Sequence, residues 1–362
     1  MQTITKPRGL AKIWREVKRP FRKIVERMER YPLAPVSLTL PFYSPTDFTS
    51  DEIFQELKPL GNFSFLPNSG NMGDIVIAMA EYQFFEKHRL KYKVFRDQFF
   101  QENLVYGGGG LFVRNWKNEY QWILELFQNK YLKKIVILPS SFHDCPDLLE
   151  IIDDRFTMFC REEKSHNYLL SSGVKGKIIL SHDMALYLSE DLPKVTPRFH
   201  SKFRNVYQQI KASAPKLTQL EGYAIAYFLR TDSEANADWS NIGVQSTLDL
   251  SLCICSDSRD PEEVAFYGKL FLAGIDMADI VVTDRLHVGI GAMLMGKKVF
   301  LLDNSYGKVS GVYERSMKQF PRVQFVDDVR NLPGVIKQTV AAGIVRQTTN
   351  LENLTKIGEV LA

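Results

Sequence analysis

Two patterns of apolar and polar positions alternate along most of the chain. Short runs of apolar residues are followed by longer segments in which apolar residues recur at helical spacing. The runs predict strands and the periodic segments predict helices, so strand and helix follow each other repeatedly. This order is typical of parallel sheets with helices on both faces. We therefore predict an α/β fold made of two doubly wound, Rossmann-like domains.

The predicted elements fall into two sets. The first set has strands at 63–66, 92–95, 103–106, 134–138, 156–159 and 177–180, and helices at 73–88, 117–130, 146–152 and 162–171. The second set has strands at 223–228, 249–254, 279–282, 298–302 and 323–325, and helices at 261–276, 286–295 and 333–341. A short helix at Ser50–Leu57 precedes both sets.

Composition divides the chain into parts. Residues 1–60 combine a basic amphipathic helix with a proline-rich connector, and residues 346–362 form a C-terminal helix or tail. Between them we predict an N-terminal domain at 61–195 and a C-terminal domain at 215–345. Residues 190–215, rich in Pro, Lys and polar groups, are the predicted link. The cleft between two such domains is the expected place for the active site.

The charge is concentrated at the N-terminus. Residues 1–30 carry ten Lys and Arg against three Glu, a net +7 in a chain of net +4, which leaves −3 for the rest. Apolar residues, with Trp14 and Phe21 among them, recur at helical spacing across residues 10–30. Such a helix suits the surface of an anionic membrane, and equally a solvated helix packed on the domain or a partner subunit. Nucleic acid is not an expected partner, because no recognition motif follows.

Cysteine usage and hydropathy indicate the compartment. None of the four cysteines forms a pair with zinc-site spacing, and they are expected to be reduced thiols: Cys145, Cys160, Cys253 and Cys255. No run of 18 apolar residues appears, and the N-terminus lacks the apolar core of a signal peptide. We expect a cytoplasmic protein, peripheral to the inner face of the cytoplasmic membrane if the basic helix binds lipid.

The segment Asp284-Arg-Leu-His287 carries the most informative chemistry. It joins an apolar strand to a helix, with Thr283 or Asp284 as the predicted cap. In open α/β sheets ligands bind at the carboxyl ends of strands, and a helix N-terminus attracts anions. Arg285 adds a planar cation suited to carboxylate or phosphate, and His287 adds a group that moves protons near neutral pH. The junction predicts an enzyme that handles a small anionic substrate.

The spacing of Arg285 and His287 sets a geometric condition. Residues two apart on a regular helix point about 200° away from each other. Both side chains therefore reach one ligand only if Arg285 still lies in the turn, Leu286 packs inward and His287 lies in the first helical turn.

Two glycine-rich segments also follow predicted strands. Asn68-Ser-Gly-Asn-Met-Gly-Asp74 supplies Asn71, Gly73 and Asp74 at a helix start, and the alternative is a glycine turn with Asp74 as an ordinary N-cap. Tyr106-Gly-Gly-Gly-Gly110 has no side chains over four positions, which fits a ligand against peptide N–H groups or a crowded crossing of strand and helix. We favour the ligand, because this run also ends a strand.

Three more candidates follow predicted strands of the first domain. Arg161 opens a helix and points either into the crevice or toward solvent beside the acids Glu162 and Glu163. His182 and Asp183 come after the strand at 177–180, where a lone histidine is more often structural.

Two cations take the equivalent place in the second domain. Arg230 ends the strand at 223–228 and joins Arg285 on an anion, unless it forms a salt bridge with Asp232 or Glu234. Lys308 follows the strand at 298–302. Because every one of these features stands at a strand's carboxyl end, together they indicate one site.

The ordered set of motifs resembles the polysaccharide pyruvyltransferase family. The matching pieces cover residues 63–315, and they are Gly70-Asn-Met-Gly-Asp74, Gly107–Gly110, Arg161-Glu-Glu-Lys-Ser165, Asp183-Met-Ala-Leu186, Arg230, Asp284-Arg-Leu-His287 and Tyr306-Gly-Lys308. The resemblance implies a fold like that of two-domain GT-B glycosyltransferases. It also implies transfer of a pyruvyl group from phosphoenolpyruvate to two hydroxyls of a sugar, forming a ketal in surface or exopolysaccharide biosynthesis.

Roles follow from the resemblance, with the donor in the C-terminal domain and the acceptor in the N-terminal domain. The catalytic residues expected are His287, Arg285 and Asp74, with His287 as the acid and Asp74 as a candidate base. Phosphoenolpyruvate is expected to contact Arg285, His287, Arg230, Lys308 and Arg161. The acceptor is expected to contact Asn71, Gly73, Gly108, Gly109 and His182. Phosphoenolpyruvate is a substrate, and neither a metal nor another cofactor is expected.

Two other classes of function compete with this one. A glycosyltransferase on the same architecture would hold the diphosphate of a nucleotide sugar at the helix N-terminus near residues 284–287. A non-catalytic, membrane-associated binding protein would use mainly the basic helix at 10–30. His and Arg side chains gathered at strand ends favour an enzyme, and its expected acceptor is a nucleotide- or polyprenyl-linked saccharide.

Overall fold

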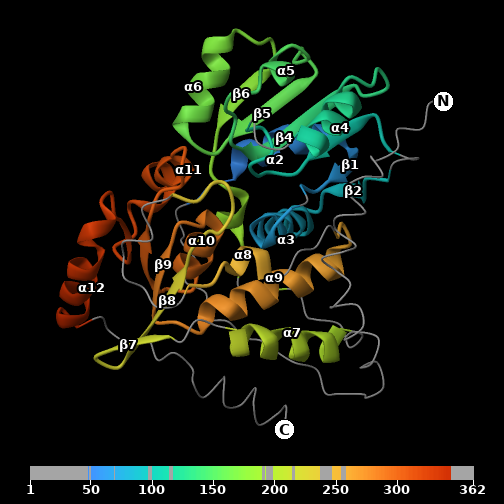
Figure 1. Ribbon diagram of the computed structural model, residues 1–362. Coiled ribbons are helices and arrows are strands. Elements are labelled where there is room, and N and C mark those ends of the chain that lie inside the picture. Colours follow the sequence, from blue (N-terminus) through green and yellow to red (C-terminus); the bar gives the residue numbers. More distant parts are fainter. Residues whose placement is uncertain are drawn as a thin grey trace.

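The chain forms two α/β units, each built on its own sheet (Figure 1). The computed structural model describes residues 48, 50–68, 70–96, 100–113, 117–189, 192, 199–213, 217–236, 247–253 and 258–343. The first unit holds a six-stranded parallel sheet in the order β2-β1-β3-β4-β5-β6. Its strands are β1 (Asn62–Leu66), β2 (Lys91–Val94), β3 (Asn103–Tyr106), β4 (Lys134–Ser140), β5 (Phe156–Cys160) and β6 (Lys177–Leu180). Its helices are α2 (Asp51–Leu57), α3 (Met72–Lys87), α4 (Lys117–Phe127), α5 (Pro146–Leu149) and α6 (Glu163–Ser172), with 3-10 turns at Lys58–Leu60 and Met184–Tyr187.

The second unit holds a five-stranded sheet in the order β11-β10-β9-β8-β7. Four of its strands are parallel, and β7 pairs with β8 in the antiparallel direction. The strands are β7 (Thr218–Leu220), β8 (Tyr223–Phe228), β9 (Ile280–Thr283), β10 (Lys298–Leu301) and β11 (Val323–Phe325). The helices are α7 (His200–Ser213), α8 (Leu250–Cys253), α9 (Pro261–Asp276), α10 (Leu286–Leu294), α11 (Lys308–Val312) and α12 (Leu332–Ala341). A π-helical turn, η5 (Tyr313–Met317), follows α11, and a 3-10 turn lies at Val329–Asn331.

Strand order places the two glycine-rich segments side by side. The order of the first sheet reverses between β1 and β3, because β2 lies on the far side of β1. The loops that leave adjacent strands on either side of such a reversal diverge and leave room for a ligand. Asn68–Asp74 leaves β1 and Gly107–Gly110 leaves β3, so both segments lie at this point.

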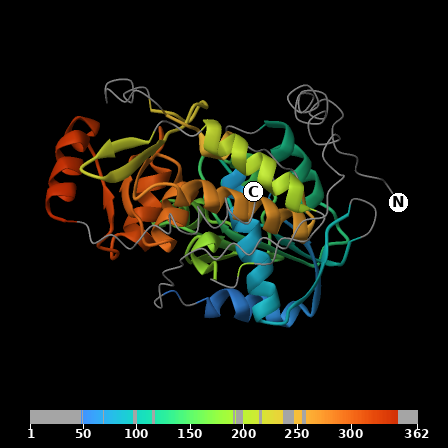
Figure 2. The same cartoon turned by 90° about the horizontal axis from the view of Figure 1, so that it is seen from below.

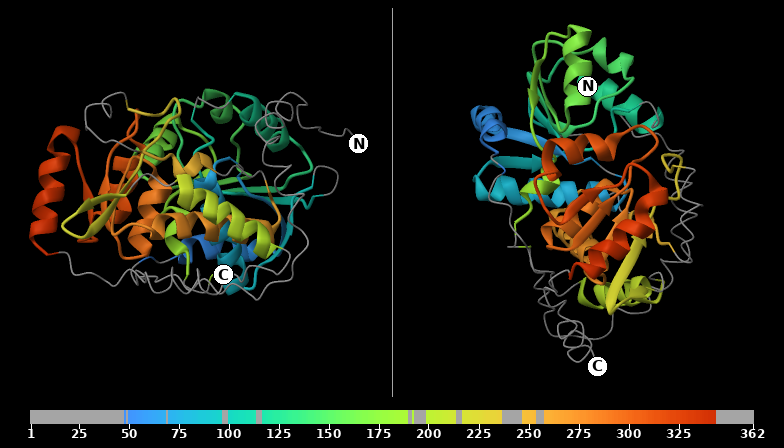
Figure 3. Two further views of the ribbon diagram at one scale, coloured as in Figure 1. Left: turned by 60° about the horizontal axis from the view of Figure 1, so that its bottom comes forward. Right: turned by 90° about the vertical axis from the view of Figure 1, so that its left-hand side faces the viewer.

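The two units share one apolar core. Helix α3 packs against α9, as Figures 1 and 2 show, and thirteen of its sixteen residues are buried. The contact is close, since a methyl group built on Gly268 of α9 would lie 2.6 Å from the sulfur of Met79. Figure 3 shows the two units stacked, with α3 between them. A continuous core of this kind fixes the strand ends of one sheet relative to those of the other.

The predicted fold class is confirmed, and most of the predicted strands and helices form within two residues of the expected bounds. The strand predicted at 249–254 is wrong: Leu250–Cys253 is a helical turn, α8. The edge of β8 is occupied instead by β7. A tight turn at Glu221 and Gly222, both with positive φ, joins β7 to β8. The domain boundaries at 61–195 and 215–345 stay predictions.

The predicted link at 190–215 contains a helix, α7, that the composition of the segment concealed. Phe203 and Tyr207 of α7 are buried, and the Phe203 ring meets Phe266 of α9 at 5.7 Å. Residues 1–47 and 344–362 lie outside the described residues, so the basic helix and the tail stay predictions. Cys145 and Cys160 are free thiols, as predicted, and both are buried, whereas the side chains of Cys253 and Cys255 lie outside the described part.

Candidate active site

The junction between β9 and α10 has the geometry that the sequence requires. Arg285 occupies the N-cap position with an extended backbone, and α10 begins at Leu286, which is buried. Arg285 therefore lies in the turn and His287 in the first helical turn, as predicted. Neither Thr283 nor Asp284 caps the helix. The hydroxyl of Thr283 instead accepts from the Arg285 N–H at 2.9 Å and donates to the carbonyl of Phe228 at 2.6 Å.

His287 meets the first unit through Asp183, which follows β6. Its Nε2 atom lies 3.3 Å from Oδ2 of Asp183, and the same oxygen accepts from Nη1 of Arg161 at 2.7 Å. Asp183 is fully buried, which raises the pKa of its carboxyl, but His287 and Arg161 outweigh burial and hold that pKa well below its usual value. An ionised Asp183 accepts a hydrogen bond from a protonated Nε2, so Nδ1 is the ring nitrogen that this contact leaves available.

Gly73 lets the His287 ring lie against the first turn of α3. A methyl group built on Gly73 would stand 2.4 Å from Nδ1 of His287, which no real side chain tolerates. Asn71 caps α3 by accepting from the Gly73 N–H at 2.7 Å, and Asp74 accepts from the Asn71 N–H at 3.0 Å. Asn71 and Asp74 thus form a capping box, so the capping interpretation of this segment is confirmed, with Asn71 rather than Asp74 at the N-cap.

Asp74 nevertheless belongs to the same group of charges as His287. Burial raises the pKa of its carboxyl, while His287, Lys308 and Arg161 are near enough to oppose that rise. A methyl group built on Gly109 would lie 3.3 Å from Oδ1 of Asp74. The carboxyl therefore faces the tetraglycine turn and keeps one oxygen outside the capping box.

Close packing explains why the first three residues of the tetraglycine run, Gly107–Gly109, are glycines. The N–H groups of Gly107, Gly108 and Gly109 donate to Leu66, Glu81 and Pro139, so they are not free for a ligand. A side chain on Gly108 would collide with the carbonyl of Pro139 at 2.5 Å, and Gly109 has a φ of +142°. The expectation that Gly108 and Gly109 offer N–H groups to the acceptor is therefore wrong, and the crowded crossing explains them.

Gly110 differs from the three glycines before it. A methyl group built there would lie 3.6 Å from Nη2 of Arg161 and 3.9 Å from Nζ of Lys308, which is ordinary contact. Gly110 thus places bare backbone between a cation of the first unit and a cation of the second.

Glu81 is a buried carboxyl that the sequence analysis did not single out. Its Oε1 atom accepts from the Gly108 N–H at 2.6 Å, and its Oε2 atom is buried without a hydrogen-bond partner among the described residues. Burial, with the charges of Asp183 and Asp74, raises its pKa to about 8 despite the hydrogen bond from Gly108. An acid within the apolar stretch Ile75–Phe85, two helical turns after Asp74, was the available signal.

The cations predicted for the donor are paired within the protein. Arg285 binds Asp249 through Nε at 2.9 Å and reaches Asp232 at 2.8 Å. Arg230 binds Asp232 at 2.9 Å and Glu234 at 2.6 Å. Lys308 binds Glu234 at 3.1 Å. For Arg230 the salt-bridge alternative is therefore confirmed, and the three cations form one chain of ion pairs.

His182 does not join the group around His287. Its Nδ1 atom lies 2.8 Å from the hydroxyl of Ser316 and its ring packs on Phe48 at 4.8 Å. Burial and the nearby Arg315 lower its pKa. These contacts give His182 a structural role between the two units, and its predicted place in the acceptor site stays a prediction.

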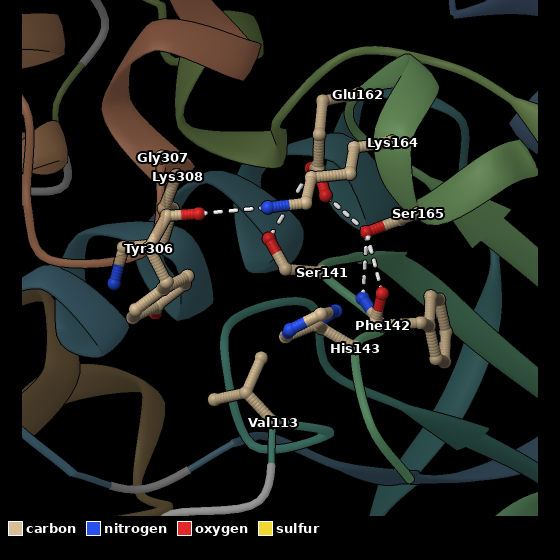
Figure 4. A pocket seen from close by; sticks show the side chains of 10 residues that line it. All are labelled: Val113, Ser141, Phe142, His143, Glu162, Lys164, Ser165, Tyr306, Gly307 and Lys308. Carbon is tan, nitrogen blue, oxygen red and sulfur yellow. Dashed lines mark hydrogen bonds between the residues drawn. The ribbon is translucent and has the colours of Figure 1, made fainter. Parts of the chain in front are cut away.

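A pocket of about 250 Å³, part of it open to solvent, lies beside this group (Figure 4). It is lined from both units, by Val113, Ser141, Phe142, His143, Glu162, Lys164, Ser165, Tyr306, Gly307 and Lys308. Lys308 is common to the pocket and to the charges near Asp74. Within the described ranges no three His, Cys, Asp or Glu side chains are placed to hold a metal ion, and the metal-free reaction stays a prediction.

The site residues stand within a sequence region that a known family shares. The model of the polysaccharide pyruvyl transferase family matches residues 71–306, nearly two thirds of the 362-residue chain. The chain belongs to this family. The resemblance drawn from the sequence motifs is thereby confirmed, together with the broad class of pyruvyl transferase.

A curated relative and a solved structure agree with the family assignment. The relative named "Putative pyruvyl transferase EpsO" from Bacillus subtilis (strain 168) is 27% identical over 295 residues, which are 74% of this chain and 89% of EpsO. The crystal structure of a functionally uncharacterised protein from Klebsiella pneumoniae is similar with a TM-score of 0.60 and 29% identity, over 78% of this chain and all of that one.

The pyruvyl transferase region runs from Asn71 to Tyr306. It includes Asp183, Arg161 and His287, and it ends two residues before Lys308. None of the helices in the described ranges is long and apolar enough to cross a membrane.

Proposed function

We propose that this pyruvyl transferase moves a pyruvyl group from phosphoenolpyruvate to two hydroxyls of a sugar and forms a cyclic ketal. The observation that carries the proposal is His287, held at 3.3 Å by the buried Asp183 beside the half-buried carboxyl of Asp74. An acid and a base fixed close together suit a reaction that adds a proton to one substrate and removes protons from the other.

The reaction balances without an oxidant or a metal. A proton adds to the methylene carbon of phosphoenolpyruvate, and one sugar hydroxyl attacks the neighbouring carbon and loses its proton. A second hydroxyl attacks the same carbon as the C–O bond to phosphate breaks. The two hydroxyl protons end on the new methyl group and on the released phosphate, and the product is the pyruvate ketal.

His287 is the proposed acid. Because ionised Asp183 holds Nε2, the Nδ1 atom is the one that delivers the proton, to the methylene carbon or to the departing phosphate. Asp74 is the proposed base: one oxygen is occupied in the capping box, and the other faces Gly109. Asp183 acts on the reaction through His287, as a positioning residue.

Phosphoenolpyruvate is an anion, and the proposed cations for it are Arg285, Arg230, Lys308 and Arg161. Asp232 bridges Arg230 and Arg285 and is the most exposed carboxylate of the ion-pair chain, with 23% of its side chain accessible. Asp232 presents its carboxylate to both guanidinium groups. The carboxylate or phosphate of a ligand would accept hydrogen bonds from the same donors. The proposed donor therefore competes with Asp232 for the two guanidinium groups.

The proposed acceptor is a nucleotide- or polyprenyl-linked saccharide of a surface or exopolysaccharide, and the proposed compartment is the cytoplasm. The basic segment at 10–30 supports attachment to an anionic membrane, where a lipid-linked acceptor resides. Sedimentation with anionic liposomes tests the attachment: deletion of residues 1–30 is expected to abolish it, and unchanged binding contradicts it.

Incubation of the protein with phosphoenolpyruvate and a panel of activated sugars tests the proposed reaction. We expect phosphate release together with a sugar product that has gained the mass of a pyruvate ketal. Turnover of a nucleotide sugar without phosphoenolpyruvate would instead establish a glycosyltransferase.

A further inference from the structure

We propose that the pocket between Lys164 and Lys308 binds the phosphate group through which the acceptor sugar is linked to its carrier. The inference rests on the proposed function, and it names a place for a part of the acceptor. The two carriers proposed for the acceptor sugar, a nucleoside diphosphate and a polyprenyl diphosphate, both contain such a phosphate group.

Two lysines converge on the pocket from different units. Lys164, in the first turn of α6, donates to the carbonyl of Tyr306 at 2.9 Å (Figure 4). Lys308, at the start of α11, binds Glu234 at 3.1 Å and lies 5.5 Å from the centre of the Tyr306 ring. His143 lines the same pocket and is exposed. Cations that reach a small pocket from two units suit an anion with several oxygens.

A carboxylate, Glu162, also lines the pocket, and both of its oxygens accept hydrogen bonds from other side chains of the protein. One of its oxygens accepts a short hydrogen bond from the Ser165 hydroxyl, and the other accepts from the Ser141 hydroxyl at 3.2 Å. The Nε atom of Arg161 lies 3.8 Å away. Because both oxygens are engaged and a guanidinium stands beside them, Glu162 repels an incoming anion less than a free carboxylate would.

Tyr306 supplies an independent observation. Its hydroxyl is buried and has no hydrogen-bond partner in the part of the chain that the structure describes. A buried hydroxyl without a partner costs free energy unless a ligand or water completes it. Since Tyr306 lines the pocket, an anion bound there would lie beside the residue that carries this unpartnered hydroxyl.

The position of the pocket favours the acceptor over the donor. His287, Asp183 and Asp74 do not line it. Two cations connect it to them: Lys308 lies near Asp74, and Arg161, which holds Asp183, donates to Ser141 of the pocket lining at 2.9 Å. Phosphoenolpyruvate is compact, so a donor placed at His287 keeps its phosphate near the reacting carbon. The acceptor is longer than the donor, so the phosphate that links its sugar to the carrier can lie in the pocket while the sugar hydroxyls lie near His287.

Calorimetric titration of the full-length protein with inorganic pyrophosphate tests the pocket. Lys164→Gln keeps a donor for the Tyr306 carbonyl and removes the charge, whereas Lys164→Arg keeps both. Lys177→Gln is the matched control, because Lys177 is an exposed lysine of the same unit that pairs with Glu56. We expect Lys164→Gln to weaken pyrophosphate binding about tenfold, which is about 1.4 kcal/mol, while Lys164→Arg and Lys177→Gln bind as the wild type does.

Competition assigns the pocket to the acceptor. Because Lys308 is shared with the cations proposed for the donor, bound pyrophosphate is expected to weaken phosphoenolpyruvate binding only partly, with both ligands bound together, and full displacement of one by the other overturns the inference. Equal pyrophosphate affinity in Lys164→Gln and the wild type overturns it as well. Uridine diphosphate that binds more tightly than pyrophosphate indicates a nucleotide-linked acceptor, and equal affinities indicate a lipid-linked one. Failure of the proposed reaction would show separately, as absence of ketal product in the wild type.

Discussion

The Nε2 atom of His287 lies 3.3 Å from Oδ2 of Asp183, although 104 residues separate the two along the chain. His287 belongs to α10 of the second unit, and Asp183 follows β6 of the first. Arg161 holds the same carboxylate oxygen at 2.7 Å. The contact joins the two units at the centre of the proposed active site, so the orientation of the imidazole depends on how the units pack.

Replacement of His287 by alanine is expected to lower kcat for ketal formation by roughly 10²–10⁴, the usual contribution of a general acid. His182→Ala provides the comparison, because His182 contacts Ser316 and Phe48 instead of the reacting group. Its kcat is expected to stay near that of the wild type. Steady-state phosphate release measures both variants, and a His287→Ala enzyme with more than a tenth of the wild-type kcat would exclude His287 as the acid.

Gly73→Ala is expected to abolish most activity while the fold persists. The added methyl group would stand 2.4 Å from Nδ1 of His287, so the ring must leave its place against α3. Alanine is otherwise favourable in the first turn of a helix. Gly110→Ala is the control, since its methyl group would come no nearer than 3.6 Å to Arg161. Melting temperatures near the wild type, with a large loss of kcat in Gly73→Ala alone, would agree with this geometry.

Asp232→Asn is expected to tighten the binding of phosphoenolpyruvate. Asp232 is paired with both Arg230 and Arg285, and its charge opposes a second anion at the same donors. Removal of the charge should lower Kd roughly fivefold, about 1 kcal/mol, as measured by calorimetry. Unchanged or weaker binding would show that the two arginines are structural and that the donor binds elsewhere.

Glu81→Gln is expected to make stability less dependent on pH. The pKa of Glu81 is raised to about 8 from an ordinary 4.5, so between these values the unfolded chain releases a proton that the folded protein keeps. The wild type therefore loses stability as the pH rises from 4.5 to 8. The variant lacks this loss and should be more stable by up to about 4 kcal/mol at pH 8, since one pKa unit is worth about 1.4 kcal/mol.

Urea unfolding at several pH values measures this difference. Glu86→Gln, an exposed position on the same helix α3, serves as the control and should show no comparable gap. A difference between Glu81→Gln and the wild type that is equally large at pH 4.5 and pH 8 would mean that an effect other than titration is responsible.

The pattern of apolar and polar residues predicted the features that depend on residues close together in the sequence. The apolar runs that became β3, β6, β8 and β11 were predicted with their observed bounds, because a strand in a sheet covered by helices needs a short apolar run whatever its neighbours are. Helical geometry set the condition that Arg285 lie in the turn and His287 in the helix if both are to reach one ligand, and the structure meets that condition. Where a partner came from elsewhere, the prediction failed: Leu250–Cys253 curls into a helical turn, and β7 takes the edge of the sheet.

The sequence by itself determined two α/β units and the strand ends at which charged side chains stand, since both depend on residues a few positions apart. Only the tertiary structure decided which charges are paired. Arg285 meets Asp249 across 36 residues, and Gly108 donates to Glu81 across 27. The pairing of His287 with Asp183 depends on the core shared by α3 and α9. The burial of a charged side chain and the distance to its partner depend on how the helices and sheets pack. Packing therefore decides which of the side chains at the strand ends lie together in one site.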